Sequence, residues 1–185
     1  DLLMDKYEDM NPEQLANLIK NINSASEHLS SLLENLLQWS RTQNGKMKFE
    51  PDTVDLYRII QENFSLLEVA AKKKSIIFHS RIRSETYAIG DNNMLKTIFR
   101  NLLSNAIKFS HVNSEVIVDI EDLSEFYYKV SVIDKGIGIS PSDIDKLFRI
   151  DVHYTTIGTS NEKGTGLGLI LCKEFIELNG GKIYV

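Results

Sequence analysis

The spacing of apolar residues predicts one long helix near the beginning of the chain. Asn11-Pro12-Glu13 is a helix-start signal, because Asn caps free amides, Pro suits the first helical position and an acid suits the positive end of the helix dipole. Beyond it, apolar or small residues recur in alternating steps of three and four as far as Asn44-Gly45, which is typical of a helix end. They are Leu15, Leu18, Ile22, Ala25, Leu29, Leu32, Leu36 and Trp39, widened by a second row at Ile19, Ser26, Leu33 and Ser40.

Such a long and one-sided helix needs another helix along its apolar stripe. Residues 1–9 are expected to be the end of that partner, with 10–12 as the turn between the two. An antiparallel hairpin with a continuous stripe is half of a four-helix bundle, so we expect a homodimer formed through it. An ordinary amphipathic helix within a monomer remains the alternative.

After a short extended connector over 46–54, the pattern alternates between helix and strand. The glycine-rich and polar stretch between 135 and 163 lacks periodicity, and loops of that length in a compact domain are usually functional lids. The predicted fold class is α+β, a long helical hairpin followed by an α/β sandwich with one mixed sheet covered by helices on one face. Its predicted helices are 56–73, 92–109 (capped by Asp91) and 165–178, and its predicted strands are 76–82, 87–89, 116–120, 128–133 and 181–185.

Composition narrows the classes of function. Charged residues make up 25% of the chain and hydrophobic residues 42%, as in ordinary globular proteins, and the net charge of −5 with both signs interspersed predicts no nucleic-acid partner. No apolar run approaches the roughly 20 residues of a membrane span, so no direct membrane contact is expected. The single cysteine, Cys172, follows three apolar residues and is predicted to be buried and inert.

A polar row lies on the predicted helix 92–109. Asn101, Asn105 and Lys108 are spaced i, i+4 and i+7 and therefore share a face of an otherwise apolar helix. A buried amide without a partner costs about 1–3 kcal/mol, so a row of them favours a ligand. Magnesium bound with a nucleotide uses few protein oxygens and several phosphate oxygens, which suits this row. A row of hydrogen bonds between helices explains the same spacing equally well.

Two glycine segments follow that helix. In the first, Asp134 ends a strand and could accept a hydrogen bond from an exocyclic amine, while Gly136 and Gly138 would let a base approach the backbone; a simple turn is the alternative. In the second, the glycines of 164–168 lie at the mouth of a helix, where free amides favour phosphate. No Lys-Thr pair follows them and no strand precedes them, which excludes a Walker loop and a dinucleotide fingerprint.

These segments, in this order, resemble the signature boxes of sensor histidine kinases of two-component systems. Residues 101–109 resemble their N box, 134–138 their first glycine box, 147–149 their F box and 164–169 their second glycine box. The helix ending at 36–41 resembles the second helix of their dimerisation and phosphotransfer hairpin. The likeness covers nearly the whole chain.

The resemblance implies a Bergerat (GHKL-type) ATP-binding domain at 46–185, with an ATP lid at about 139–163, after the C-terminal part of the hairpin at 1–45. It implies ATP and Mg²⁺ as ligands, with Asn105 on the metal, Lys108 on phosphate and Asp134 on adenine. Phe148 would anchor the lid. The implied nucleotide-binding set is Asn101, Asn105, Lys108, Asp134, Gly136, Gly138, Phe148, Lys163, Gly164, Thr165, Gly166, Leu167 and Gly168.

The implied reaction is transfer of the ATP γ-phosphoryl group to a histidine and then to an aspartate of a response-regulator receiver domain, in the cytoplasm. In the family the acceptor histidine lies on the first hairpin helix and is followed by an acid and, soon after, a proline. His28 lies on the second helix and is followed by Leu29 and Ser30, so it does not match. We therefore expect the acceptor to be missing from residues 1–185, and the chain alone not to phosphorylate itself.

Two alternatives remain open, a Bergerat-fold ATPase and a dimeric scaffold that binds nucleotide without kinase activity. Hydrolytic relatives carry a glutamate four residues before the metal-binding asparagine. This chain has Asn101 there, and an amide cannot act as a general base. The resemblance thus favours transfer to a protein side chain over hydrolysis.

Overall fold

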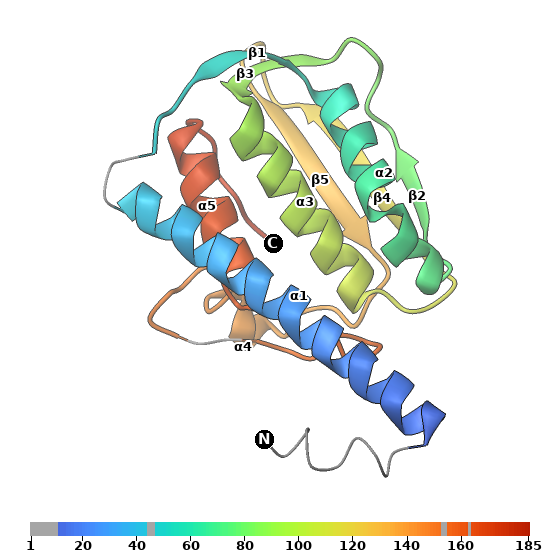
Figure 1. The fold of residues 1–185 in the computed structure, drawn as a ribbon. Helices are drawn as coiled ribbons and strands as arrows, with labels where there is room; N and C mark the ends of the chain where they lie inside the picture. The colour runs from blue at the N-terminus through green and yellow to red at the C-terminus, as the bar shows by residue number, and fades with distance from the viewer. Residues whose placement is uncertain (1–10, 44–46, 153–154, 163) are drawn as a thin grey trace.

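A computed structural model describes residues 11–43, 47–152, 155–162 and 164–185 of the chain, which combine helices with two small sheets (Figure 1). The expected first hairpin helix, over residues 1–9, lies outside these described residues. The elements are α1 (Pro12–Gln43), β1 (Pro51–Asp55), α2 (Leu56–Lys73), β2 (Ile77–Ser80), β3 (Tyr87–Asp91), α3 (Asn92–Phe109), β4 (Glu115–Asp122), β5 (Tyr128–Asp134), α4 (Pro141–Ile144) and α5 (Gly168–Leu178).

The long helix α1 begins where its start signal predicted. The Asn11 side chain accepts a hydrogen bond from the Gln14 amide at 2.8 Å, and the Gln14 side chain accepts one from the Asn11 amide at 3.0 Å. This reciprocal capping box satisfies two of the amides that a helix start leaves unpaired. With 32 residues, α1 is about 48 Å long, and Figure 1 shows its N-terminal part extending beyond the rest of the fold.

The strands form two sheets, so the prediction of one mixed sheet is wrong. β1 pairs only with β3, antiparallel from Pro51↔Asp91 to Asp55↔Tyr87. β4 lies between β2, its parallel neighbour, and β5, its antiparallel neighbour. β1 lies in the stretch that was predicted to be an extended connector. The sequence did not indicate a strand there, because its pairing partner lies far along the sequence and only Val54 within it is buried.

The predicted strand 181–185 is also wrong. These residues have no regular secondary structure and follow a turn in which Gly180 adopts a φ of +74°. The alternating sequence reflects packing rather than pairing, since Ile183 packs against a small apolar cluster beside α5.

Helix α3 lies between two apolar cores. On one side, α2 and α3 cover the three-stranded sheet, with Ile60, Leu103 and Val116 among the fully buried side chains. On the other side, Met94 and Ile98 pack against α5, and Cys172 is fully buried there, as predicted. Burial raises the pKa of the Cys172 thiol to about 12. Because both flanks of α3 are apolar, only the strip between the two cores is left for polar side chains.

Only the C-terminal part of α1 packs on this body, through Trp39 against the α5 cluster and through the buried Asn35. Seven large apolar side chains of α1 stay exposed: Leu15, Ile19, Ile22, Leu29, Leu33, Leu36 and Leu37. Within the described parts of the chain, no helix has both the length and the apolar character needed to cross a membrane.

Candidate functional site

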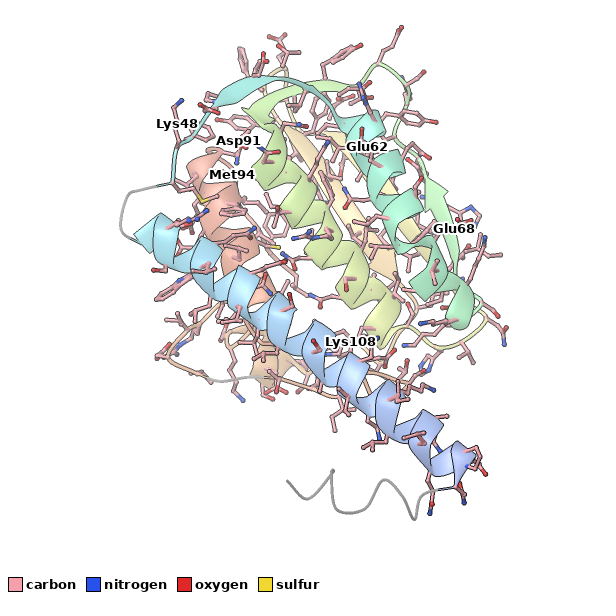
Figure 2. All side chains as sticks on the ribbon, viewed as in Figure 1. Lys48, Glu62, Glu68, Asp91, Met94 and Lys108 are labelled. Atoms are coloured by element: carbon pink, nitrogen blue, oxygen red, sulfur yellow. The ribbon has the colours of Figure 1, made fainter. Side chains whose placement is uncertain are left out.

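The polar row predicted from spacing lies on α3, which Asp91 fixes at its start. The Asp91 carboxylate accepts hydrogen bonds from the Asn93 and Met94 amides at 3.0 and 3.1 Å. Asp91 and Lys108 lie at opposite ends of this helix (Figure 2). The side chains of the row are all half-buried. The Asn101 Nδ2 atom is buried beside the Cys172 thiol of α5, and its hydrogen bond to that thiol opposes the rise that burial causes in the pKa of Cys172.

Lys108, at the last turn of α3, faces the lid. Its Nζ donates to the Thr156 carbonyl at 3.1 Å and lies 4.5 Å from the centre of the Phe109 ring. Burial lowers the pKa of Lys108, with the nearby Lys74 adding to the decrease and Glu162 opposing it. A cation held partly out of water in this way interacts strongly with an anion that replaces the lost hydration.

The first glycine segment is fastened to the C-terminal end of α3. Gly136 forms a β-bridge with Ser110, and the Ile137 amide donates to the Phe109 carbonyl at 3.3 Å. A Cβ on Gly136 would lie 2.3 Å from the Phe109 carbonyl oxygen, so only glycine permits this approach. Asp134, at the end of β5, is thereby held beside α3. Burial raises the pKa of Asp134, while the Gly136 amide, which donates to its carboxylate, opposes the rise.

The second glycine segment runs along the polar row. A Cβ on Gly164 would lie 2.5 Å from Lys108 Nζ, and one on Gly168 would lie 3.1 Å from Asn101 Oδ1. The two ends of the segment therefore face the two ends of the row. α5 begins at Gly168, so the predicted helix start at Thr165 is wrong, because Gly166 adopts a left-handed φ of +75° that a right-handed helix excludes.

The structure brings some of the predicted site residues together, whereas others lie apart from them or outside the described residues. The glycine segments and the row on α3 come together, and Gly138 adopts the left-handed φ of +66° that favours glycine. Phe148 is half-buried in the stretch between β5 and α5, just after the short helix α4. Lys163 lies outside the described residues, so its predicted phosphate contact stays a prediction.

The donor set fits a magnesium–nucleotide complex better than a metal held by protein alone. In the part of the chain that the structure describes, no cluster of three or more His, Cys, Asp or Glu side chains could hold a metal ion. Magnesium bound with a nucleotide takes most of its ligands from phosphate and water, so one amide oxygen is a sufficient protein contribution. The close approach of the Gly164 backbone to the Lys108 ammonium places a cation beside bare backbone, which suits a bound anion.

Sequence reasoning missed two contacts with this site. Lys74, the last lysine of the run 72–74, is buried and contacts both α3 and the lid, whereas its two neighbours are exposed. Asn35 of α1 lies 3.5 Å from the Thr165 hydroxyl in the second glycine segment. A lysine run usually indicates a solvated surface, so the sequence carried no signal for the first contact.

Comparison with known proteins identifies the family of the chain. Residues 90–185 match the family model described as histidine kinase-, DNA gyrase B- and HSP90-like ATPase. The catalytic domain of the histidine kinase ThkA is similar at 30% identity and a TM-score of 0.60, over 75% of this chain and 86% of that one. The histidine kinase AdeS of Acinetobacter baumannii shares the fold at 20% identity and a TM-score of 0.71, over 95% of this chain and 80% of that one.

A third similar structure contains ThkA in complex with the response regulator protein TrrA. It shares the fold at 23% identity and a TM-score of 0.75, over 99% of this chain and 51% of that one.

The chain therefore belongs to the histidine kinase-, DNA gyrase B- and HSP90-like ATPase family. Within that family, its fold and sequence match the catalytic domains of sensor histidine kinases of two-component systems.

Proposed function

We propose that this chain binds Mg²⁺–ATP between α3 and the two glycine segments and donates the γ-phosphoryl group to a histidine. The observation that carries this proposal is the convergence of the second glycine segment on the polar row, with Gly168 facing Asn101 and Gly164 facing Lys108. Bare backbone that faces an amide at one end and a cation at the other suits a triphosphate.

Each part of the site has a proposed role. Asp134 accepts a hydrogen bond from the exocyclic amine of adenine, and the backbone at Gly136 and Gly138 lets the base approach. Lys108 and the amides of 164–168 hold phosphate. Asn105 contributes the protein oxygen to Mg²⁺, with Asn101 supporting it, and the ion when bound neutralises phosphate charge.

The proposed reaction is an in-line displacement at the γ-phosphorus. An imidazole nitrogen of the acceptor histidine forms a bond to the γ-phosphorus, and the bond to the bridging oxygen breaks, so that ADP leaves with the electron pair. The phosphoryl group then passes to an aspartate carboxylate of a response regulator. Catalysis rests on positioning and charge neutralisation. The amide of Asn101, where a general base would be needed for hydrolysis, supports a protein acceptor over water.

The domain organisation belongs to the same proposal. Residues 1–45 would form part of a dimerisation hairpin, residues 46–185 the catalytic domain and about 139–163 a lid anchored by Phe148. The exposed apolar stripe of α1 supports a homodimer, because such surfaces mark interaction sites. The ThkA–TrrA complex supports a response regulator as the second partner, and both point to a cytoplasmic signalling role.

The experiment is phosphoryl transfer from γ-labelled ATP with Mg²⁺. A longer polypeptide that completes the hairpin with its acceptor histidine should gain an acid-labile, base-stable label, whereas residues 1–185 alone should gain none. Released phosphate without protein label would indicate an ATPase instead. Bound nucleotide with neither product would indicate a scaffold.

A further inference from the structure

Lys74 is a buried cation at the end of α2 that caps the C-terminal end of α3. Its side chain is 6% exposed, and its Nζ donates to the Ile107 carbonyl at 2.9 Å and to the Lys108 carbonyl at 2.7 Å. The last carbonyls of a helix have no amide partner within the helix and carry the negative end of its dipole. Lys74 therefore supplies hydrogen-bond donors to two free carbonyl groups in the last turn of α3, which is the turn that carries Lys108.

The same ammonium group also holds the far end of the lid. It lies 2.7 Å from the Thr159 hydroxyl and 2.7 Å from Glu162 Oε1. The Thr159 hydroxyl is 2.6 Å from the Ser110 carbonyl, and the Thr159 amide donates to the Lys108 carbonyl at 3.1 Å. Segments that are distant in sequence, the ends of α2 and α3 and the turn 158–162, thus share one cation.

The turn 158–162 is a closed unit. The Gly158 amide donates to the Glu162 carbonyl at 2.9 Å, and the Ser160 amide donates to Glu162 Oε2 at 2.8 Å. A Cβ on Gly158 would lie 2.8 Å from the Lys108 carbonyl oxygen, so the turn packs directly on α3. Partial burial acts to raise the pKa of Glu162. The ion pair with Lys74 and the hydrogen bonds from backbone amides outweigh this effect and hold the pKa below its usual value.

The two contacts of the Lys108 side chain with the lid flank this turn. Thr156, whose carbonyl accepts from Lys108 Nζ, lies just before it, and Gly164, whose backbone faces Lys108 Nζ, lies just after it. Moving the turn would therefore move both neighbours of the Lys108 ammonium. Lys74 holds this turn from the end of α2, a different helix from the one that carries Lys108.

We infer that Lys74 is a positioning residue, which anchors the turn 158–162 to the end of α3 and thereby sets how Lys108 and Gly164 are placed relative to each other for the nucleotide phosphates. This inference rests on the proposed function, because it needs phosphate bound by Lys108 and the backbone at Gly164. The adenine contact at Asp134 is fastened to α3 separately, through Gly136 and Ser110. Loss of the Lys74 contacts should therefore weaken binding of the phosphates and leave the affinity for the base unchanged.

The experiment compares Mg²⁺–ATP and adenosine affinities of Lys74→Met with those of the wild type, by calorimetry and by competition with a fluorescent nucleotide. Lys74→Met should lower the ratio of ATP to adenosine affinity about tenfold, the scale of one charge-assisted hydrogen-bond network. A loss of folded protein alone would weaken both ligands equally and leave the ratio unchanged. The matched control is Lys73→Met, which removes the exposed neighbouring charge and should keep the wild-type ratio.

A second variant keeps the test decisive if Lys74→Met does not fold. Glu162→Gln leaves the contacts of Lys74 with α3 and with Thr159 but removes the charge from its ion pair with the turn, so the ratio should fall in the same direction. A wild-type ratio in a folded Lys74→Met, or in Glu162→Gln where Lys74→Met is unfolded, would overturn the anchor while the proposed function stands. A wild-type chain that binds adenosine and ATP equally well would overturn both.

Discussion

Replacing Gly136 by Ala should separate the first glycine segment from α3. The new Cβ would lie 2.3 Å from the Phe109 carbonyl oxygen and 2.6 Å from Asp134 Oδ1, and the first of these is backbone that cannot move without bending the end of the helix. The segment must then give up the two backbone bonds of its bridge to Ser110, from the Ile137 amide to the Phe109 carbonyl and from the His111 amide to the Lys135 carbonyl. At about 1 kcal/mol for each backbone bond, the expected loss of unfolding free energy is about 2 kcal/mol.

The matched control is Gly138→Ala. Gly138 has a φ of +66°, and no atom lies within 4 Å of the position of an added Cβ. Its substitution should therefore cost only the strain of a left-handed alanine, about 1 kcal/mol. Gly136→Ala should also weaken ATP, because it displaces the Asp134 carboxylate. Urea unfolding followed by circular dichroism, and ATP titration of each folded variant, measure the two effects. Equal stability of the two variants, or a Gly136→Ala variant that binds ATP as the wild type does, would refute this reasoning.

Three further predictions follow from the same contacts. Asp134→Asn and Asn105→Asp should each abolish useful ATP binding while leaving the circular dichroism spectrum unchanged, and unchanged affinity in both would disprove the proposed roles. Burial raises the pKa of the Cys172 thiol to about 12 from its ordinary value of 9.0, so the folded protein should resist iodoacetamide at pH 8 and lose stability as the pH rises above 9. Rapid labelling before unfolding would contradict this. Leu33→Glu should shift the homodimer expected for the longer polypeptide towards monomer in analytical ultracentrifugation, whereas Ser30→Glu, also exposed on α1, should not.

Local signals predicted the helices well. The bounds predicted for α2 and α3 match the structure, because a cap residue and a 3.6-residue period lie within each segment. Asp91 was predicted as the cap of α3 and accepts from two amides there. The start of α5 was misplaced because Gly166 adopts a left-handed φ of +75°, which the sequence pattern of the segment does not indicate.

Pairings between distant segments could not be predicted in the same way. β1 is a strand because β3 lies beside it, and no period within residues 51–55 indicates this. For the site, spacing within α3 was enough to find the polar row, and the glycine segments indicated which loops meet it. Lys74 could not be singled out from the run 72–74, since its burial depends on the end of α3 lying opposite.

The most direct test of the central claim is an amide NMR titration of the chain with Mg²⁺–ATP and, separately, with adenosine. The account predicts that the amides of Gly164, Gly166 and Gly168 shift with ATP and not with adenosine, whereas those of Gly136 and Gly138 shift with both. Shifts that avoid both glycine segments, or shifts at 164–168 that adenosine reproduces in full, would contradict the claim that phosphate lies between the second glycine segment and α3.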